Sequence, residues 1–534
     1  MMGMSRFLQA ASIAVALAVA APAAAQPATP DREQVLQTMR RATEFMVDKV
    51  AYNGGYVWSY APDMSRRWGE MEAKPTMIWI QPPGTATMGH VFLDAYHATG
   101  DDYYYRAAEQ VAGALIWGQH PSGGWNYIVD FGGEASLKDW YDTYGKNAWR
   151  LEEFQHYYGN ATFDDAGTSE AMQFLLRLYV EKRDPKYRPA LERAIGFVLD
   201  AQYPVGGWPQ RYPLRGEDYT GYITFNDDVA GENIKFLVMV YQALGDARVL
   251  GAVRRAMDSF ILTQQGQPQP GWALQYTLDL KPAAARSYEP LSLATHTTAN
   301  NLDQLMNFYE LTGDTRFLAR VPEGIDWLDR VKLPAAQVRN GRTHPTFIEI
   351  GTDRPLYVHR RGSNVVNGAY YVDYDPDRTV GHYGSTRAIN VAALRQRYAS
   401  LKATPPAEVA RNSPLAAKNL TPLPPYFATR DLQTSDLNVR TAGEGGTGSG
   451  AADVAALVSG LNAEGYWPAP LRVTSNPYTG AVPPSLARGD FATTHVGDAT
   501  DTSPYPLTAP TTVISTGTYI QNMSALIDAL GGGR

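Results

Sequence analysis

The sequence contains no cysteine among its 534 residues. This absence excludes disulfide bonds, thiolate zinc sites and cysteine nucleophiles. Beyond the N-terminus, no apolar run approaches the roughly 18 to 20 residues that a membrane-spanning helix needs. Basic residues form no dense block, and 47 Lys and Arg stand against 54 Asp and Glu, which disfavours nucleic acid as the main partner. We expect the chain to be stabilised by packing alone.

The N-terminus carries a short apolar segment. Arg6 precedes the apolar run 7–20, and three alanines at 23–25 stand before Gln26. A positive residue, a short apolar stretch and an Ala-x-Ala site are typical of a secretory signal. We therefore predict that residues 1–25 are a signal peptide and that the protein is exported by a bacterium, to the periplasm or the medium.

Aromatic residues are abundant, at 11% of the chain with 33 Tyr and 11 Trp. Such a bias suits flat polar ligands such as sugars, although we expect most of these rings to pack in the core. A turn with Gly and Trp also recurs along the chain. Its copies are Gly54-Gly55-Tyr56-Val57-Trp58, Gly123-Gly124-Trp125, Gly206-Gly207-Trp208 and Gly271-Trp272.

The segments around these turns have helical periodicity. Tyr187, Leu191, Ile195 and Val198 form one apolar stripe of a 3.6-residue helix. An aspartate opens each segment, and three of the segments end at a glutamine before the turn: the aspartates are Asp101, Asp184, Asp246 and Asp314, and the glutamines Gln119, Gln202 and Gln264. Repeated helical hairpins must stack to bury both faces. The sequence predicts a mainly all-α fold, an α/α toroid, with the loops after each Trp gathered at one end.

The C-terminal part differs in composition. From about Ala403 the chain is rich in Pro, Thr, Ser and Gly, and residues 443–450 are nearly a linker. We predict that residues 26–402 form the toroid. Residues 403–534 are expected to be an irregular extension that docks on it through the last helix, since such a stretch would make a poor independent core.

Two acidic motifs occupy equivalent places in successive repeats. They are Thr162-Phe163-Asp164-Asp165 and Thr224-Phe225-Asn226-Asp227-Asp228. These residue types also serve as plain helix caps, so that interpretation stays open. Each motif has more acid than one cap requires, however. Carboxylate and amide oxygens are hard ligands suited to Ca²⁺, whereas zinc is a poor fit because histidine is sparse nearby.

Two basic segments follow. The first is Lys281 to Glu289, with Arg286 and Tyr288, and the second is Asp353 to Gly362, with Arg354, Arg360 and Arg361. Arginine forks bind carboxylates bidentately, so these groups would suit an acidic sugar. Salt bridges at the rim of the protein are the simpler interpretation, above all for Arg354 and Arg361.

The segments Ala201 to Leu214, with Gly206-Gly207-Trp208-Pro209-Gln210, and Tyr222 to Asp228 strongly resemble the pectate lyases of polysaccharide lyase family 10. The resemblance spans roughly residues 45–400. It implies an α/α toroid that cleaves polygalacturonate by Ca²⁺-assisted β-elimination. We expect the protein to be a monomer. By motif, Asp164 and Asp227 look like metal ligands, with Asp164 also catalytic. Arg360 looks like the catalytic base. The implied substrate-binding residues are Arg286, Trp208, Tyr288 and Asn226.

The chain departs from the family at several positions. Thr346-Phe347-Ile348 stands where the family has an Arg-Phe-Tyr-like segment, the flanks of the base are His359 and Arg361 instead of aspartates, and Ala230-Gly231 replaces a larger residue. These changes leave the particular polyuronate open. Because the pKa of arginine exceeds ~12 in nearly all settings, His359 and Tyr383 are competing candidates for the base.

Three rival functions use the same features. A glycoside hydrolase would use two of Asp164, Asp165, Asp227 and Asp228 as acid and base. A non-catalytic binding protein for acidic polysaccharides would keep the aromatic rings without needing Arg360. Triterpene cyclases share a similar Gln-to-Trp repeat, but the chain has neither of their aspartate-rich motifs, D-x-D-D and D-D-x-x-D.

Overall fold

The computed structural model describes residues 30–145, 152–361, 369–377, 379, 384–415, 454–471 and 512–531. The predicted signal peptide, the linker-like segment 443–450 and Tyr383 lie outside these ranges. None of the helices in the described ranges is long and apolar enough to cross a membrane.

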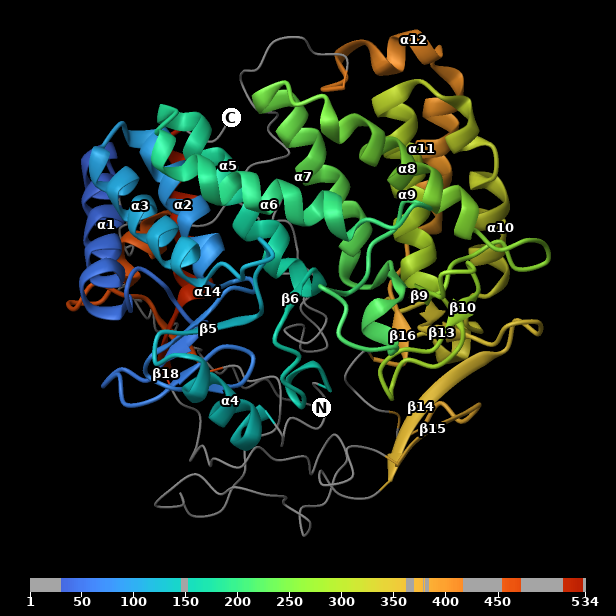
Figure 1. The fold of residues 1–534 in the computed structure, drawn as a ribbon, viewed down its shortest axis with the longest axis horizontal. Coiled ribbons are helices and arrows are strands. Elements are labelled where there is room, and N and C mark those ends of the chain that lie inside the picture. Colours follow the sequence, from blue (N-terminus) through green and yellow to red (C-terminus); the bar gives the residue numbers. More distant parts are fainter. Residues whose placement is uncertain are drawn as a thin grey trace, which may run out of the picture.

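The described chain is mainly helical and forms an α/α toroid, as predicted (Figure 1). Helices that form hairpins pack in pairs, and α14, α2, α5 and α7 contact one another in this order, as do α9 and α11. The inner helices are α2 (Thr85–Thr99), α5 (Gly167–Lys182), α7 (Val229–Leu244), α9 (Thr295–Thr312) and α11 (Val391–Ala403). The outer helices are α1 (Arg32–Phe45), continued by a π-helical turn at Met46–Val50, α3 (Asp102–Gly118), α6 (Arg188–Ala201), α8 (Arg248–Thr263) and α10 (Val321–Arg330). Two further helices, α4 (Glu134–Thr143) and α12 (Pro406–Val409), lie in connections.

The repeated residues explain why the hairpins form. Asp101 accepts a hydrogen bond from the backbone N–H of Tyr103 at 2.8 Å, which caps α3. At the other end of an outer helix, Gln202 Nε2 donates to Gly206 O and to Ala252 O, each at 2.9 Å. The glutamine therefore ties its own Gly-Trp turn to the next outer helix. Gln119 and Gln264 make the equivalent pairs of bonds.

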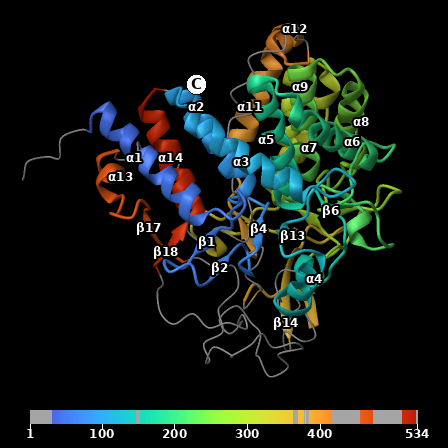
Figure 2. The same ribbon diagram turned by 60° about the vertical axis from the view of Figure 1, so that its left-hand side comes forward.

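The C-terminal extension contains one more copy of this unit, which the sequence analysis did not find. Trp467 Nε1 donates to Leu457 O at 2.8 Å, ten residues back, as Trp208 does to Val198 O. Helix α13 (Val454–Gly460) precedes this turn, and α14 (Thr516–Ala529) packs against α1 and α2 (Figure 2). The end of the chain thus supplies an inner helix beside α2.

Short antiparallel strands link the loops at one end of the ring (Figure 1). Five of them form a sheet in the order β17-β18-β1-β2-β3: β17 (Pro468–Pro470), β18 (Thr512–Ser515), β1 (Ser59–Tyr60), β2 (Arg67–Trp68) and β3 (Glu72–Ala73). The pairs are β4 (Met77–Trp79) with β5 (Ile128–Asp130), β6 (Ala161–Thr162) with β7 (Arg211–Tyr212), and β12 (His344–Pro345) with β16 (Thr386–Arg387). A three-stranded sheet holds β8 (Ile223–Thr224), β9 (Gln275–Tyr276) and β10 (Pro282–Ala283).

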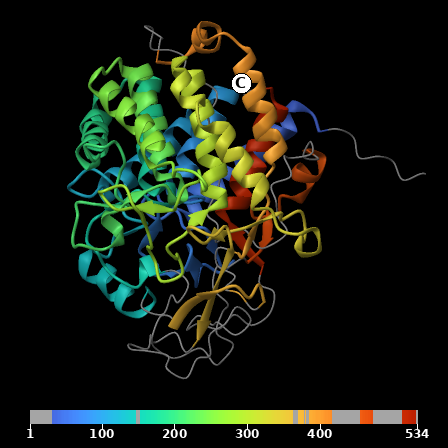
Figure 3. The same cartoon turned by 90° about the vertical axis from the view of Figure 1, so that its right-hand side faces the viewer.

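The remaining sheet joins β11 (Leu293–Ala294), β13 (Phe347–Ile348), β14 (Pro355–Arg361) and β15 (Ala369–Asp373). Its β14–β15 hairpin extends from the strand-bearing end of the ring (Figure 3). One large apolar core lies between the helices, and a small separate cluster beneath the hairpin contains Tyr288, Phe347 and Val358.

Candidate active site

The two acidic motifs form matching turns before α5 and α7. Each turn places two successive residues in the left-handed region: Asp165 and Ala166 have φ of 50° and 56°, and Asp227 and Asp228 have φ of 50° and 54°. Such conformations are costly for residues other than glycine and are concentrated at functional sites. Neither helix has a side-chain cap hydrogen bond in these turns. The acidic residues are therefore not the helix caps that the sequence left open.

Arg286 lies at the centre of a buried carboxylate cluster. Its guanidinium is in ion-pair contact with Asp164 through Nη2, and Nη1 lies 3.0 Å from Glu289 Oε1. Its Nε is 3.3 Å from Glu153 Oε2, and Nη1 is 3.8 Å from Asp227 Oδ2. The Arg286 side chain is only 3% exposed. One buried cation therefore contacts four carboxyl groups, which come from three connections between helices: α4–α5, α6–α7 and α8–α9.

The two equivalent aspartates have opposite protonation tendencies. Burial opposes ionisation of Asp164, but Arg286 and hydrogen bonds from Asp227, Tyr127 and Gln210 outweigh it and lower the pKa of this carboxyl. Burial and the adjacent charge of Asp164 raise the pKa of Asp227 well above its usual value. Asp227 therefore tends to hold a proton that Asp164 accepts in a hydrogen bond, as expected for two carboxyls that share one site.

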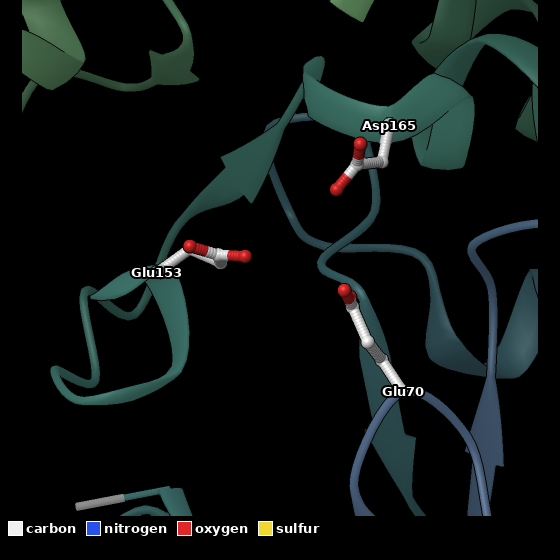
Figure 4. A group of neighbouring side chains, drawn as sticks. All are labelled: Glu70, Glu153 and Asp165. Carbon is white, nitrogen blue, oxygen red and sulfur yellow. The ribbon is translucent and has the colours of Figure 1, made fainter. Parts of the chain in front are cut away.

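Two overlapping groups of carboxylates have the spacing that a metal ion needs. In the group Asp164, Asp165 and Asp227, one oxygen of each residue lies within 4.8 Å of the others. The same holds for Glu70, Glu153 and Asp165, whose carboxylates approach one another from three different segments (Figure 4). Gln81 joins these segments, because its Nε2 donates to Glu70 at 3.1 Å and to Asp165 at 2.9 Å.

Three residues predicted to bind substrate are buried. Asn226 is 2% exposed and donates through Nδ2 to Glu289 Oε1 at 2.9 Å. The Tyr288 hydroxyl donates to Glu153 Oε2 at 3.2 Å. Both residues therefore donate hydrogen bonds to carboxylates that pair with Arg286. Trp208 is fully buried and its indole N–H donates to Val198 O, so in this structure it fills the core instead of facing a ligand.

Arg360 lies on β14, and its backbone pairs with that of Tyr370 on β15. The Tyr370 ring meets Tyr288 edge-on at 5.6 Å between centroids, and Val358 packs in the same cluster. Since side chains alternate along a strand, position 360 shares the face of Val358, which is the face toward Tyr288. The side chain of Arg360 is outside the described part.

His359 occupies the opposite face of the same strand. Its ring stacks on Tyr371 at 5.1 Å, and Nε2 lies 2.8 Å from Asp373 Oδ1. These contacts direct it away from the Tyr288 cluster and weaken its candidacy as the base. The other competitor, Tyr383, is outside the described residues.

Several site residues were not predicted from the sequence. Gln210, which donates to Asp164 at 2.7 Å, lies in the Gly-Gly-Trp-Pro-Gln segment and could have been noticed there. The Tyr127 hydroxyl also donates to Asp164, and its place two residues after the Gly-Trp turn is a weaker signal. Glu70 and Gln81 stand in no motif, so only the fold reveals that they belong to this region.

Residues 137–383 match the family described as pectic acid lyase. No curated protein matches the chain. A solved mutant of the family 10 polysaccharide lyase from Cellvibrio cellulosa, in complex with trigalacturonic acid, is 20% identical with a TM-score of 0.42, covering 59% of this chain and 98% of that one. Another structure of the Cellvibrio cellulosa lyase is 23% identical with a TM-score of 0.38, covering 53% and 86%. A D-mannose isomerase is 11% identical with a TM-score of 0.40, covering 71% and 100%.

The family match begins within α4 and ends after β15, so it includes Asp164, Asp227, Arg286 and Arg360. Residues 137–383 thus match the pectic acid lyases, and the protein is accordingly a polysaccharide lyase.

Proposed function

We propose that the protein cleaves a 4-linked polyuronate, polygalacturonate or a close relative, by calcium-assisted β-elimination. The observation that supports this most strongly is the contact of Arg286 with Asp164 and Asp227, which joins two predicted metal ligands to a predicted substrate ligand. The carboxylates of the site outnumber its one buried arginine and would repel an acidic sugar. A bound cation such as Ca²⁺ would offset this negative charge and allow the sugar to bind. The family match supports this reaction type and substrate class.

The residues present fit a calcium ion. Asp164, Asp165 and Asp227 offer hard carboxylate oxygens at ligand spacing, and there is no thiol in the chain. Gln210, which bonds Asp164 through its amide N–H, also has a buried carbonyl oxygen, Oε1, that accepts no hydrogen bond within the described residues. We propose Asp164 and Asp227 as the ligands, with Asp165 beside them. When bound, the ion would stabilise negative charge that develops on the uronate carboxylate.

The elimination needs a base at C5 of the uronate. Removal of the C5 proton leaves an electron pair that forms the C4–C5 double bond, while the C4–O bond breaks and the leaving oxygen takes a proton. The family resemblance implies Arg360 as the base, with His359 and Tyr383 as competing candidates. Arg286 is the described arginine that contacts the carboxylates, so the two arginines compete for the roles of base and substrate clamp. Either residue must lose a proton from an ordinarily very basic group, which nearby cations favour.

The test is a lyase assay on polygalacturonate followed by ultraviolet absorbance of the conjugated double bond. We expect absorbance to rise, to stop with a chelator and to return with added Ca²⁺. A hydrolase would release reducing ends without absorbance, and a binding protein would retain the polymer without cleaving it. Either result would refute the proposal. We also propose, from the sequence, that the protein is exported and acts as a monomer.

A further inference from the structure

We propose that Trp117, Phe131 and Tyr52 form an aromatic platform that binds pyranose units of the polysaccharide outside the carboxylate cluster. The inference rests on the proposed acidic polysaccharide as substrate. All three residues precede residue 137, where the family match begins, so the match assigns nothing to them.

The three rings form a continuous row. Trp117, on the last turn of α3, stacks on Phe131 with ring centroids 4.1 Å apart and an interplanar angle of 20°. The Tyr52 ring contacts Phe131 in a T-shaped arrangement, with ring centroids 5.8 Å apart. Rings held in this way lose little conformational freedom when a ligand arrives, which favours binding.

Trp117 is the exposed tryptophan of the described residues. Its side chain is 55% exposed, whereas the nine other tryptophans of the described ranges are all buried. Because Trp117 stacks on Phe131 through one face of the indole, the exposed area includes ring surface that a flat ligand can cover. The carbon-bound hydrogens on one face of a pyranose ring can pack on such a surface while the hydroxyl and carboxylate groups remain in water.

The platform is close to the catalytic region along the chain. Phe131 follows β5, and Tyr127, four residues earlier, donates to Asp164. An extended segment rises ~3.3 Å per residue, so the Cα atoms of these two residues are separated by at most about 13 Å. The end of α3 lies against β5, since a Cβ atom at Gly118 would meet Val129 at 2.5 Å. If one sugar unit of a polymer binds near Asp164, units a short distance along the polymer can therefore reach the platform.

This geometry commits the platform to one occupant, a stretch of the same polyuronate chain. Its expected contribution is polymer affinity and not chemistry, because none of the three rings contacts the carboxylate cluster in the structure. Cleavage of short oligomers that bind only at the carboxylate cluster should not depend on the platform.

The test compares Trp117→Ala with Leu262→Ala in the full chain. Leu262 on α8 is also 55% exposed, so the control removes an equally exposed apolar side chain elsewhere on the ring. We expect Trp117→Ala to weaken retardation in a gel containing polygalacturonate by about three- to tenfold, and to raise KM for the polymer similarly. Its turnover of trigalacturonate should equal that of the parent and of Leu262→Ala. Trp117→Phe keeps an aromatic ring and should retain most of the polymer binding. It replaces the alanine variant in the comparison if that variant folds poorly.

Retardation of Trp117→Ala equal to that of the parent would overturn the inference. So would a loss of self-association in sedimentation, because the platform would then be a contact between two copies. The gel measures binding without cleavage, so its result is separate from the proposed function. If retardation depends on Trp117 but no unsaturated product forms, the platform would be supported and the proposed lyase activity refuted.

Discussion

Arg286 lies between the equivalent aspartates of two successive repeats, in contact with Asp164 and with Nη1 at 3.8 Å from Asp227 Oδ2. Glu153 and Glu289 complete its surroundings. A buried charge that loses its partner is costly, typically by about 3–5 kcal/mol. Arg286→Ala should therefore lower stability as well as activity, and Arg286→Lys, which keeps the charge, is the more informative variant of catalysis.

The first prediction assigns the base. If Arg360 removes the C5 proton, Arg360→Ala should lower kcat by orders of magnitude with KM nearly unchanged, because the group acts in the transition state. Arg360→Lys should keep partial activity with a shifted pH optimum. His359→Ala is the control and should have a small effect, since its ring contacts Tyr371 and Asp373 on the other face of the hairpin.

A different pattern would move the base to Arg286. In that case Arg360→Ala would mainly raise KM, while Arg286→Lys would lower kcat and shift the pH optimum at an unchanged melting temperature. A large loss of kcat in His359→Ala alone would contradict both arginine assignments.

The second prediction concerns calcium and pH. Burial and Asp164 raise the pKa of Asp227, so this carboxyl tends to be protonated in the metal-free protein. Calcium must displace that proton, because it binds the ionised carboxylate. Affinity for Ca²⁺ should therefore rise with pH through the raised pKa of Asp227 and level off above it. Calorimetric titrations in buffers of different ionisation enthalpy should show proton release on binding.

Asp227→Asn provides the matched control, because the amide has nearly the same shape and no proton to release. We expect this variant to bind Ca²⁺ weakly and without proton release, while its helical circular dichroism is retained. Full lyase activity of Asp227→Asn in the presence of chelator would exclude Asp227 as a metal ligand.

The third prediction concerns a buried acid between the inner helices. Glu170 on α5 is fully buried, its Oε2 accepts from Thr87 at 2.7 Å, and burial raises its pKa to about 8. The unfolded carboxyl ionises near 4.5, so the folded state binds more protons between these values. The contribution of Glu170 to stability is fully present below pH ~4.5 and is lost as pH rises toward 8.

Glu170→Gln removes this proton linkage and keeps an oxygen for Thr87. Relative to the parent, the variant should gain stability between pH 5 and pH 8, on the order of a few kcal/mol. Urea unfolding at the two pH values measures the difference. If the free energy of unfolding changed equally with pH in parent and variant, Glu170 would be ionised in the folded protein.

Sequence periodicity was sufficient to predict the ring of hairpins. The aspartate caps, the glutamines and the buried Trp of the turns are local features that make equivalent bonds in most copies. Trp58 is an exception, since its indole N–H donates to Gln81 O. The copy at Asn462 to Trp467 was missed because its turn has Tyr466 where the others have glycine and lies in a segment of biased composition. It is recognisable in the structure from Gly465, which has φ of 107°, close to the 104° of Gly206.

The site was less accessible to sequence reasoning. Matching positions in adjacent repeats indicated that Asp164 and Asp227 belong together, and the structure places both beside Arg286. The contacts of Gln81 with Glu70 and Asp165 depend on the loops of separate hairpins meeting at one end, which no local pattern specifies. Trp208 illustrates the opposite error, since a conspicuous motif residue is part of the core.

The fourth prediction tests the turn geometry. Gly206 has φ of 104°, and a Cβ atom there would lie 1.9 Å from Arg255 O on the next outer helix. Gly206→Ala should therefore destabilise the protein by about 2–5 kcal/mol through backbone strain and overpacking. Gly196→Ala within α6 is the control: nothing lies within 4 Å of its Cβ position, so it should be neutral or stabilising by up to ~1 kcal/mol. Thermal unfolding of both variants measures the contrast.

The last prediction concerns the role of the C-terminal helix in the ring. Met523 and Leu526 on α14 are fully buried, and the Tyr519 hydroxyl lies 2.7 Å from Thr43 Oγ1 on α1. Strand β18 also pairs with β1, which anchors the segment immediately before the helix. If these contacts hold the extension to the ring, Met523→Ala should cost about 2–5 kcal/mol through the cavity it leaves. The exposed neighbour Gln521 is the control, and Gln521→Ala should have little effect. Limited proteolysis provides a second measurement, because a docked helix resists cleavage until the whole ring unfolds. Release of an active body lacking the residues after 403, with an unchanged melting temperature, would show instead that the extension is only tethered.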